Sequence, residues 1–382
     1  MNLTTLRIDT GTTWAPASLS EVDSQQTLLL LFGTSGLLEH PDQIRQVLAA
    51  CPRSHVIGCS TSGEIYGSEI TDDTLVVAAV RLDHTRLLTA QAAVQTPSDS
   101  YAAGSTIAAQ LKQPALKAVL VLSDGLHVNG SELVKGLNDV FEGSVVVTGG
   151  LAGDGPRFKS TWVIADRKPQ SGYVTAVGFY GDRVRIGHGS KGGWDKFGPE
   201  RLVTRSAGNV LYELDGKPAL QLYKEYLGDR AAGLPATGLL FPLALRASRA
   251  DEKSLVRTIL AVDETQQSMT FAGDIPQGSL AQLMRANFDR LIQGASEAAS
   301  LTAKGHTGSP ASNPTLSVAI SCVGRRLVLG ERTEEETEAA LELLPKDSRQ
   351  VGFYSYGEIS PYASGACDLH NQTMTLTTIT EV

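Results

Sequence analysis

The chain of 382 residues contains only four cysteines, and no two of them form a CxxC pair. Neither a zinc site of common spacing nor a disulfide framework is therefore expected, and any haem would be bound without a CxxCH attachment motif. No apolar run approaches the about 20 residues that cross a membrane. Residues 1–14 lack the basic and then apolar pattern of a signal peptide. We therefore expect a cytoplasmic protein with no membrane span.

The chain also lacks an excess of positive charge. Lys and Arg together number 33 and Asp and Glu 41, which gives a formal net charge of −8 at pH 7. Nucleic-acid binding needs clustered Lys and Arg, so no nucleic-acid partner is expected. Hydrophobic residues make up 42% of the chain, which is typical of a globular protein, and its length favours two domains.

Three stretches of the sequence share one order of elements. In each, a strand, a small-residue turn, a helix and a second strand lead to a glycine-rich turn with an acidic residue. The paired strands are expected at residues 27–32 and 55–57, 118–122 and 144–148, and 315–320 and 350–353. Recurrence at this scale predicts repeated units whose turns face a common region. The alternative is that strand–helix alternation recurs by chance, as it does in any α/β protein.

These patterns predict an α/β fold, or a mixed α+β fold, with two domains built from repeated strand–turn–helix–strand units. The expected segments are an N-terminal extension at 1–25, a first domain at 26–228 and a second at 229–382. Between the second and third repeats, Ser279 is expected to cap a long amphipathic helix that carries Leu280, Leu283 and Phe288 on its faces.

Six motifs along the chain carry a resemblance to a known family. In the first half they are Gly58-Cys59-Ser60-Thr61-Ser62-Gly63-Glu64-Ile65, Gly149-Gly150-Leu151-Ala152-Gly153-Asp154 and Tyr212-Glu213-Leu214-Asp215-Gly216-Lys217-Pro218-Ala219. In the second half they are Ser321-Cys322-Val323-Gly324-Arg325, Gly352-Phe353-Tyr354-Ser355-Tyr356-Gly357-Glu358-Ile359 and Leu369-His370-Asn371-Gln372-Thr373. The first three resemble the N-terminal FIST domain and the last three the C-terminal FIST domain.

The resemblance implies an intracellular sensory protein that binds a small ligand. FIST domains are found fused to or encoded beside histidine kinases, chemotaxis proteins and cyclic-di-GMP enzymes. Amino acids have been proposed as their ligands, and some members bind haem and sense nitric oxide. No kinase or cyclase segment follows the C-terminal motifs here. We therefore expect a signal-transduction protein of the two-component type, whose partner is a separate sensor histidine kinase or cyclic-di-GMP enzyme.

The turn from Gly58 to Ile65 allows three interpretations. Its hydroxyl and backbone N–H groups are suited to holding a polar ligand at the end of a strand, where open α/β sheets bind ligands. A nucleophilic Ser60 would need the second glycine of the nucleophile elbow, which is missing, and a Cys59 thiolate would need a nearby base. The third interpretation is a turn that satisfies its own backbone. We expect ligand binding and no enzyme, with a Cys- or Ser-dependent enzyme as the alternative.

Charged residues in the repeated turns favour an amino acid as one possible ligand. Glu64, Asp154 and Glu358 occupy comparable places and would bind an ammonium group if the turns converge. Arg325 would hold the matching carboxylate. The alternative is that these charges pair with one another or lie in solvent. The predicted ligand-binding residues are Cys59, Ser60, Thr61, Ser62, Glu64, Asp154, Arg325, Tyr356, Glu358 and Asn371.

Haem b, the cofactor that the resemblance implies for some members, needs an axial ligand and an apolar slot. His188 lies between two glycines, whose missing side chains would leave room for a large planar ligand. His370 follows a segment rich in tyrosine. These two histidines are the candidate axial ligands. A lone histidine is more often a hydrogen-bonded structural group than a metal ligand, and that interpretation stays open for both.

Overall fold

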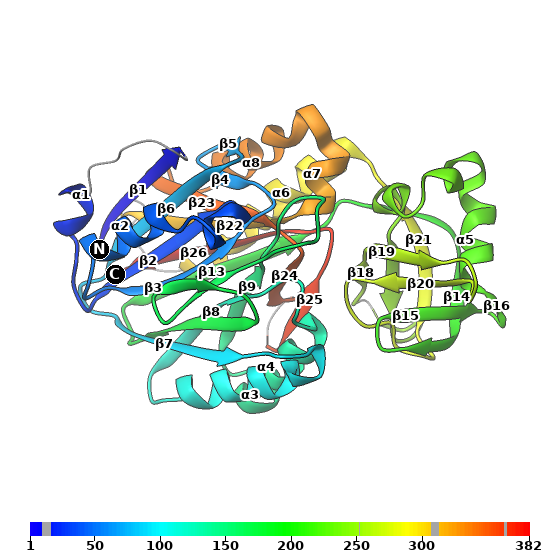
Figure 1. Ribbon diagram of the computed structural model, residues 1–382, viewed down its shortest axis with the longest axis horizontal. Helices are drawn as coiled ribbons and strands as arrows, with labels where there is room; N and C mark the ends of the chain where they lie inside the picture. The colour runs from blue at the N-terminus through cyan, green and yellow to red at the C-terminus, as the bar shows by residue number, and fades with distance from the viewer. Residues whose placement is uncertain (10–16, 252, 307–312, 363–364) are drawn as a thin grey trace.

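The computed structural model describes residues 1–9, 17–251, 253–306, 313–362 and 365–382. Figure 1 shows a large body and a smaller lobe that stands beside it. The lobe, residues 195–285, is inserted into the last of three repeated units, and the rest of the described chain forms the body. The fold is mixed α/β, as the sequence predicts.

The three repeated units of the body follow one another along the chain. Unit one comprises β1 (Asn2–Asp9), α1 (Ala17–Ser20), β2 (Thr27–Gly33), α2 (Asp42–Ala50), β3 (His55–Ser60), β4 (Glu64–Tyr66), β5 (Glu69–Thr71) and β6 (Thr74–Arg81). Unit two comprises β7 (Arg86–Ala93), α3 (Ser100–Leu111), β8 (Leu116–Ser123), α4 (Gly130–Phe141), β9 (Val146–Leu151), β10 (Val163–Ala165), β11 (Lys168–Gln170) and β12 (Tyr173–Tyr180). Unit three comprises β13 (Val184–Lys191), α6 (Phe288–Thr302), β22 (Thr315–Cys322), α7 (Val323–Leu329), α8 (Thr333–Glu342), β23 (Ser348–Ser355), β24 (Gly357–Pro361), β25 (Cys367–His370) and β26 (Met374–Glu381).

Each unit forms the centre of one six-stranded sheet, and the three sheets share one strand order. The orders are β1-β6-β2-β3-β10-β11, β7-β12-β8-β9-β24-β25 and β13-β26-β22-β23-β4-β5. In every sheet the two central strands are parallel, and they are the strand pairs expected from the sequence. The repeat inferred from the sequence is therefore confirmed for all three units.

The last two strands of each sheet come from a different unit. The hairpin β4–β5 of unit one joins the sheet of unit three, β24–β25 of unit three joins unit two, and β10–β11 of unit two joins unit one. Every unit thus gives one hairpin and receives one, so the exchange closes into a ring. Because segments far apart in sequence complete one another's sheets, the units of the body depend on one another for their stability.

The central strands of each sheet are buried on both faces, as β2 and β22 show. The inner faces share one core, in which Phe32 of unit one stacks on Phe353 of unit three with ring centroids 5.0 Å apart. The outer faces are covered by the helices of the same unit, such as α3 and α4 over the sheet of unit two. Strands buried on both faces read as continuous apolar runs, which explains the unbroken run of leucines in β2.

Glycines recur at one equivalent position in the second central strand of the three units. A Cβ atom added to Gly58, Gly149 or Gly352 would lie 2.5, 1.8 or 1.8 Å from a carbonyl oxygen of the neighbouring parallel strand. No side chain fits at such distances. The three glycines are therefore required by the close approach of the strands, not by a ligand.

The lobe is a smaller mixed structure of its own. It comprises β14 (Asp195–Ala207), β15 (Val210–Leu214), β16 (Lys217–Pro218), α5 (Ala219–Leu227), the 3-10 helices η3 (Gly228–Gly233) and η4 (Ala236–Leu240), β17 (Leu243–Arg246), β18 (Leu255–Arg257), β19 (Ile259–Asp263), β20 (Ser268–Phe271) and β21 (Leu280–Arg285). The prediction of a helix capped by Ser279 is wrong. Leu280 to Arg285 pairs with β14 and β17 as a strand, and helix α6 begins only at Phe288, where Asn287 caps it. Strand pairing within the lobe overrides the helical spacing of the apolar residues.

Candidate functional site

The turns that follow β3, β9 and β23 meet in the body. The backbone N–H of Ser62 donates to the carbonyl of Tyr354 at 2.8 Å, that of Tyr356 to Leu151 at 3.2 Å, and that of Gly153 to Ser60 at 3.0 Å. Each donor lies two residues after the acceptor of its own unit, so three equivalent hydrogen bonds close a ring. The predicted turns thus converge, and their backbones bind one another.

Two buried glutamates repeat one hydrogen-bonding pattern in units one and three. Glu64 accepts from the Thr61 hydroxyl and from the backbone N–H and hydroxyl of Thr74. Glu358 accepts at 2.6 Å from the Ser355 hydroxyl and from the equivalent two groups of Thr373, at 3.2 and 2.9 Å. Burial raises the pKa of Glu64 to about 7 and that of Glu358 to about 8. All oxygens have internal partners, so these side chains stabilise the turns.

Asp154, the acid of the second unit, has a different environment. It is buried and accepts from the backbone N–H groups of Phe158, Lys159 and Ser160 at 2.8 to 3.0 Å, and from the Tyr356 hydroxyl. Asp154 therefore orders the loop that follows β9 and fixes Tyr356 against it. It faces these groups and does not line the cavities described below.

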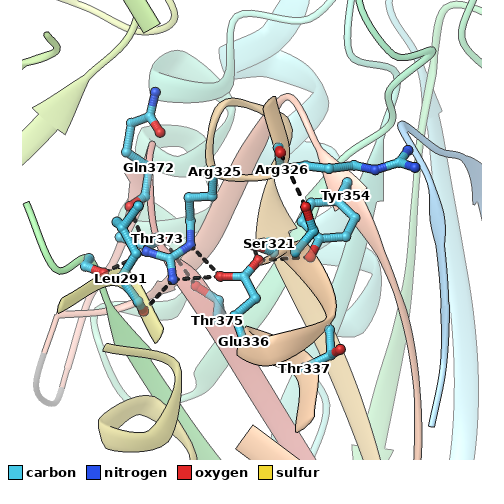
Figure 2. Close-up of polar contacts among 12 residues, drawn as sticks. Leu291, Ser321, Arg325, Arg326, Glu336, Thr337, Tyr354, Gln372, Thr373 and Thr375 are labelled. Carbon is cyan, nitrogen blue, oxygen red and sulfur yellow. Dashed lines mark hydrogen bonds and ion pairs between the residues drawn. The ribbon is translucent and has the colours of Figure 1, made fainter. Parts of the chain in front are cut away.

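Arg325 is fully buried, and all five of its N–H groups have acceptors. Nε and Nη2 donate to one oxygen of Glu336 at 2.9 and 2.6 Å, and Figure 2 shows the two side chains facing each other. The remaining donors bond the carbonyls of Gly192, Leu291 and Gln372. Arg325 thus has no group left for a ligand carboxylate.

The partners of Arg325 give it a structural role. Gly192 precedes the lobe in the chain and Leu291 follows it, so one guanidinium holds both connections between body and lobe. The second oxygen of Glu336 accepts from Ser321 at 2.9 Å and from Tyr354 at 2.8 Å (Figure 2). We name Arg325, Glu336, Ser321 and Tyr354 the hinge clamp.

In the first turn, the hydroxyl groups of Ser60 and Ser62 are hydrogen-bonded within the protein, and the Cys59 thiol is unreactive. The Ser60 hydroxyl accepts from the backbone N–H of Trp162 at 3.1 Å, and that of Ser62 accepts from Gly155 at 2.9 Å. Burial raises the pKa of the Cys59 thiol well above its usual value, so the thiol stays protonated. A protonated thiol is a poor nucleophile.

A cavity of about 310 Å³ lies between the body and the lobe, and we name it the interlobe cavity. Its wall in the body includes Leu126, Phe158, Val323 and Tyr356, which follow strands of units two and three. Its wall in the lobe includes Thr258, Leu260, Phe271, Ala272 and Gly273. A second hollow of about 660 Å³ shares Phe158, Leu239, Leu260 and Val323 with it. Of the predicted ligand-binding residues, Tyr356 lines the interlobe cavity.

The lining of both hollows carries no charged side chain among the described residues. It is mainly aliphatic and aromatic, with a few amide and hydroxyl groups. Sequence analysis did not single out Phe158, Thr258 or Leu260. They come from different parts of the chain and no local pattern marks them as neighbours.

Polar contacts hold the lobe against the body beside this cavity. Asp274 of the lobe accepts at 3.3 Å from the side chain of Asn129, and its backbone N–H donates to the Ser131 hydroxyl at 3.2 Å. Arg257 donates to the carbonyl of Leu369 at 3.0 Å. These contacts join the lobe to the body beside the cavity.

The candidate axial ligands His188 and His370 line one further cavity, of about 570 Å³. Burial lowers the pKa of both imidazoles, that of His370 to about 4, so both are neutral at pH 7. His370 donates from Nε2 to the carbonyl of Ser360 at 3.0 Å. Asn371 is buried beside it and donates to the carbonyl of His370 at 3.0 Å.

The glycines on either side of His188 do not leave room for a planar ligand. A Cβ atom at Gly187 would lie 2.1 Å from the carbonyl oxygen of Thr302, and one at Gly189 would lie 2.0 Å from that of Ala298. Helix α6 therefore packs against Gly187 and Gly189, so these glycines do not supply the room for haem that the sequence suggested. In the described part of the chain, no three His, Cys, Asp or Glu side chains form a metal-binding group.

Comparison with known proteins identifies the domains along the chain. A profile of the FIST N domain matches residues 27–217, and a profile of the FIST C domain matches residues 219–361. Curated proteins give no sequence match. A crystal structure of cyanuric acid hydrolase from A. caulinodans aligns over 99% of both chains with 8% identity and a TM-score of 0.37, which is too low to support an argument about fold or function. No helix in the described residues is long and apolar enough to cross a membrane.

Proposed function

The chain belongs to the FIST family, whose domains are generally sensory ligand-binding modules of signal transduction, and we propose that it senses a small molecule bound in the interlobe cavity. The observation that carries this proposal is the uncharged cavity beside Tyr356, enclosed by both body and lobe. Largely apolar clefts between structural units, with a few polar groups, are the usual sites for small ligands. The cavity also lies beyond strand ends, where α/β sheets bind ligands.

A ligand in this cavity would contact body and lobe together and so favour the docked lobe. A ligand shifts an equilibrium by its differential affinity for the two states. The hinge clamp fixes the base of the lobe, while Asp274 and Arg257 hold it beside the cavity. We propose that the docked lobe changes the surface offered to a signalling partner, a sensor histidine kinase or a cyclic-di-GMP enzyme.

The first test blocks the cavity without disturbing the core. Leu260 is 40% exposed and lines both hollows, so Leu260→Trp would fill the space while the protein folds normally. Thermal-shift screening of neutral aromatic, neutral aliphatic and amino-acid compounds is expected to find stabilising ligands of the wild type, since a ligand that binds only the folded state raises Tm. Leu260→Trp should abolish these shifts.

Leu202→Trp is the matched control, because Leu202 is another lobe leucine, 42% exposed, outside both hollows. It should keep the shifts of the wild type. Equal shifts in all three proteins would refute binding in the interlobe cavity.

Two features weigh against an amino acid as the ligand. Glu64, Glu358 and Arg325 are paired internally, and the cavity lining has no charge to neutralise a zwitterion. Burying an unpaired charge is costly. Catalysis is not part of the proposal either, since the Cys59 and Cys322 thiols have pKa values raised by burial.

A second candidate function is sensing of nitric oxide by non-covalently bound haem b. It is favoured by the single cavity that both His188 and His370 line, and by their neutral imidazoles. His188 is the better axial ligand, because the Nε2 of His370 is already hydrogen-bonded. Bound haem would supply an iron that coordinates nitric oxide.

A visible-range titration with haemin tests this candidate. A shifted Soret band is expected for the wild type and for His84→Ala, an exposed control, and should be lost or displaced in His188→Ala. If haemin gives no Soret shift, or if His188→Ala behaves as the wild type, haem does not bind through His188.

A further inference from the structure

The interlobe cavity contains an aromatic side chain in an unusual position. Phe158 is 47% exposed, and its ring stacks on that of Tyr356, with centroids 4.5 Å apart and planes inclined by 12°. Stacking on one face leaves the other side of the ring exposed where it lines both hollows.

The backbone of Phe158 is strained to hold this position. Its φ of +51° lies in the left-handed region, which a bulky residue rarely adopts. The conformation is fixed by Asp154, which accepts from the Phe158 N–H at 2.9 Å and also from the Tyr356 hydroxyl. Strain of this kind persists where surrounding contacts enforce it, and it clusters at ligand sites.

The opposite wall of the cavity has an unsatisfied hydroxyl. Thr258 is only 4% exposed, and its Oγ1 has no hydrogen-bond partner in the described part of the chain. A buried hydroxyl without a partner destabilises the folded protein. Thr258 lines the interlobe cavity from the lobe, and Phe158 lines it from the body.

From the exposed ring of Phe158, the Thr258 hydroxyl and the uncharged lining, we infer that the interlobe cavity binds an uncharged, planar aromatic compound. This compound carries a hydroxyl or carbonyl group. The ring stacks on Phe158, and the polar group pairs with the Thr258 hydroxyl, which both donates and accepts. This inference rests on the proposed function and specifies its ligand class. Body and lobe each contribute one of the two contacts, so only a docked lobe offers both.

Calorimetric titration of the full chain with 2-naphthol, a neutral bicyclic phenol, tests the inference. Phe158→Ala should weaken binding about tenfold, since it removes both the stacking and the buried area of the ring. Phe288→Ala is the matched control, because Phe288 is also exposed, at 42%, and lies outside both hollows. It should bind 2-naphthol as the wild type does.

The hydroxyl is tested separately with naphthalene, which has the same ring system without the polar group. Thr258→Val should weaken the binding of 2-naphthol about fivefold and leave the binding of naphthalene unchanged. Circular dichroism would verify that each variant is folded.

Failure of this inference is distinguishable from failure of the proposed function. The aromatic ligand class is refuted if 2-naphthol does not bind the wild type. It is also refuted if Phe158→Ala and Thr258→Val both bind 2-naphthol as tightly as the wild type. Shifts by other compounds that Leu260→Trp abolishes would still support the cavity as the sensory site.

Discussion

Replacing Glu336 with alanine is expected to lower the free energy of unfolding by about 3–5 kcal/mol. The substitution leaves the fully buried Arg325 guanidinium without its carboxylate, and it removes the acceptor of the Ser321 and Tyr354 hydroxyls. An unpaired buried charge is among the few causes of losses this large. Urea unfolding followed by circular dichroism measures the effect.

The neighbouring Glu335→Ala is the control for that experiment. Glu335 also pairs with an arginine, Arg332, but this pair lies at the surface. Exposed pairs contribute little, so the midpoint of unfolding should stay close to that of the wild type. A loss for Glu336→Ala no greater than for Glu335→Ala would contradict the role of the hinge clamp.

The second large effect is a loss of stability on raising the pH through neutrality. The pKa of Glu358 is raised by burial from 4.5 to about 8, and that of Glu64 to about 7. Between those ordinary and raised values the folded protein binds more protons than the unfolded chain. The contribution of these two glutamates to stability is therefore greatest below their ordinary pKa and is lost as the pH rises through the raised one.

From about pH 6.5 to about pH 8, Glu358 alone is expected to lower the free energy of unfolding by about 1–2 kcal/mol. Glu358→Gln, which keeps the shape of the protonated acid, should flatten this dependence, and a double variant with Glu64→Gln should flatten it further. Glu334 is exposed, so Glu334→Gln should show the same dependence of stability on pH as the wild type. An unchanged slope in Glu358→Gln would mean that Glu358 is ionised in the folded protein at neutral pH.

Both effects involve residues that were predicted to bind a ligand, since Glu336 is the partner of Arg325 and the pH effect comes from Glu358 and Glu64. Glu64 and Glu358 hold the turns of units one and three by the same three hydrogen bonds. Arg325 holds the two connections to the lobe. The turns meet as the repeat predicts, but the carboxyl groups of Glu64 and Glu358 are hydrogen-bonded within their own units. The cavity that we propose to bind a ligand lies beside them and is lined by Tyr356 and Phe158.

The sequence alone determined the repeated units, the central strand pairs and one helix between the two strands of each pair. Those elements are specified locally, by continuous apolar runs, by helical spacing and by caps such as Asn129, which bonds the first turn of α4. Even the failure at Ser279 has a local cause, since Leu280 to Arg285 carries a spacing that suits either a helix or a strand paired on both sides.

Only the tertiary structure decided which unit receives each hairpin, what Arg325 binds and which residues line the interlobe cavity. Arg325 and Gly192 are 133 residues apart, and Phe158 and Thr258 reach one cavity from different units of the fold. A contact between such distant residues leaves no periodicity or motif in the sequence, because it depends on how whole sheets and the lobe pack together. Local patterns therefore specified the parts of this protein, and long-range packing specified its candidate site.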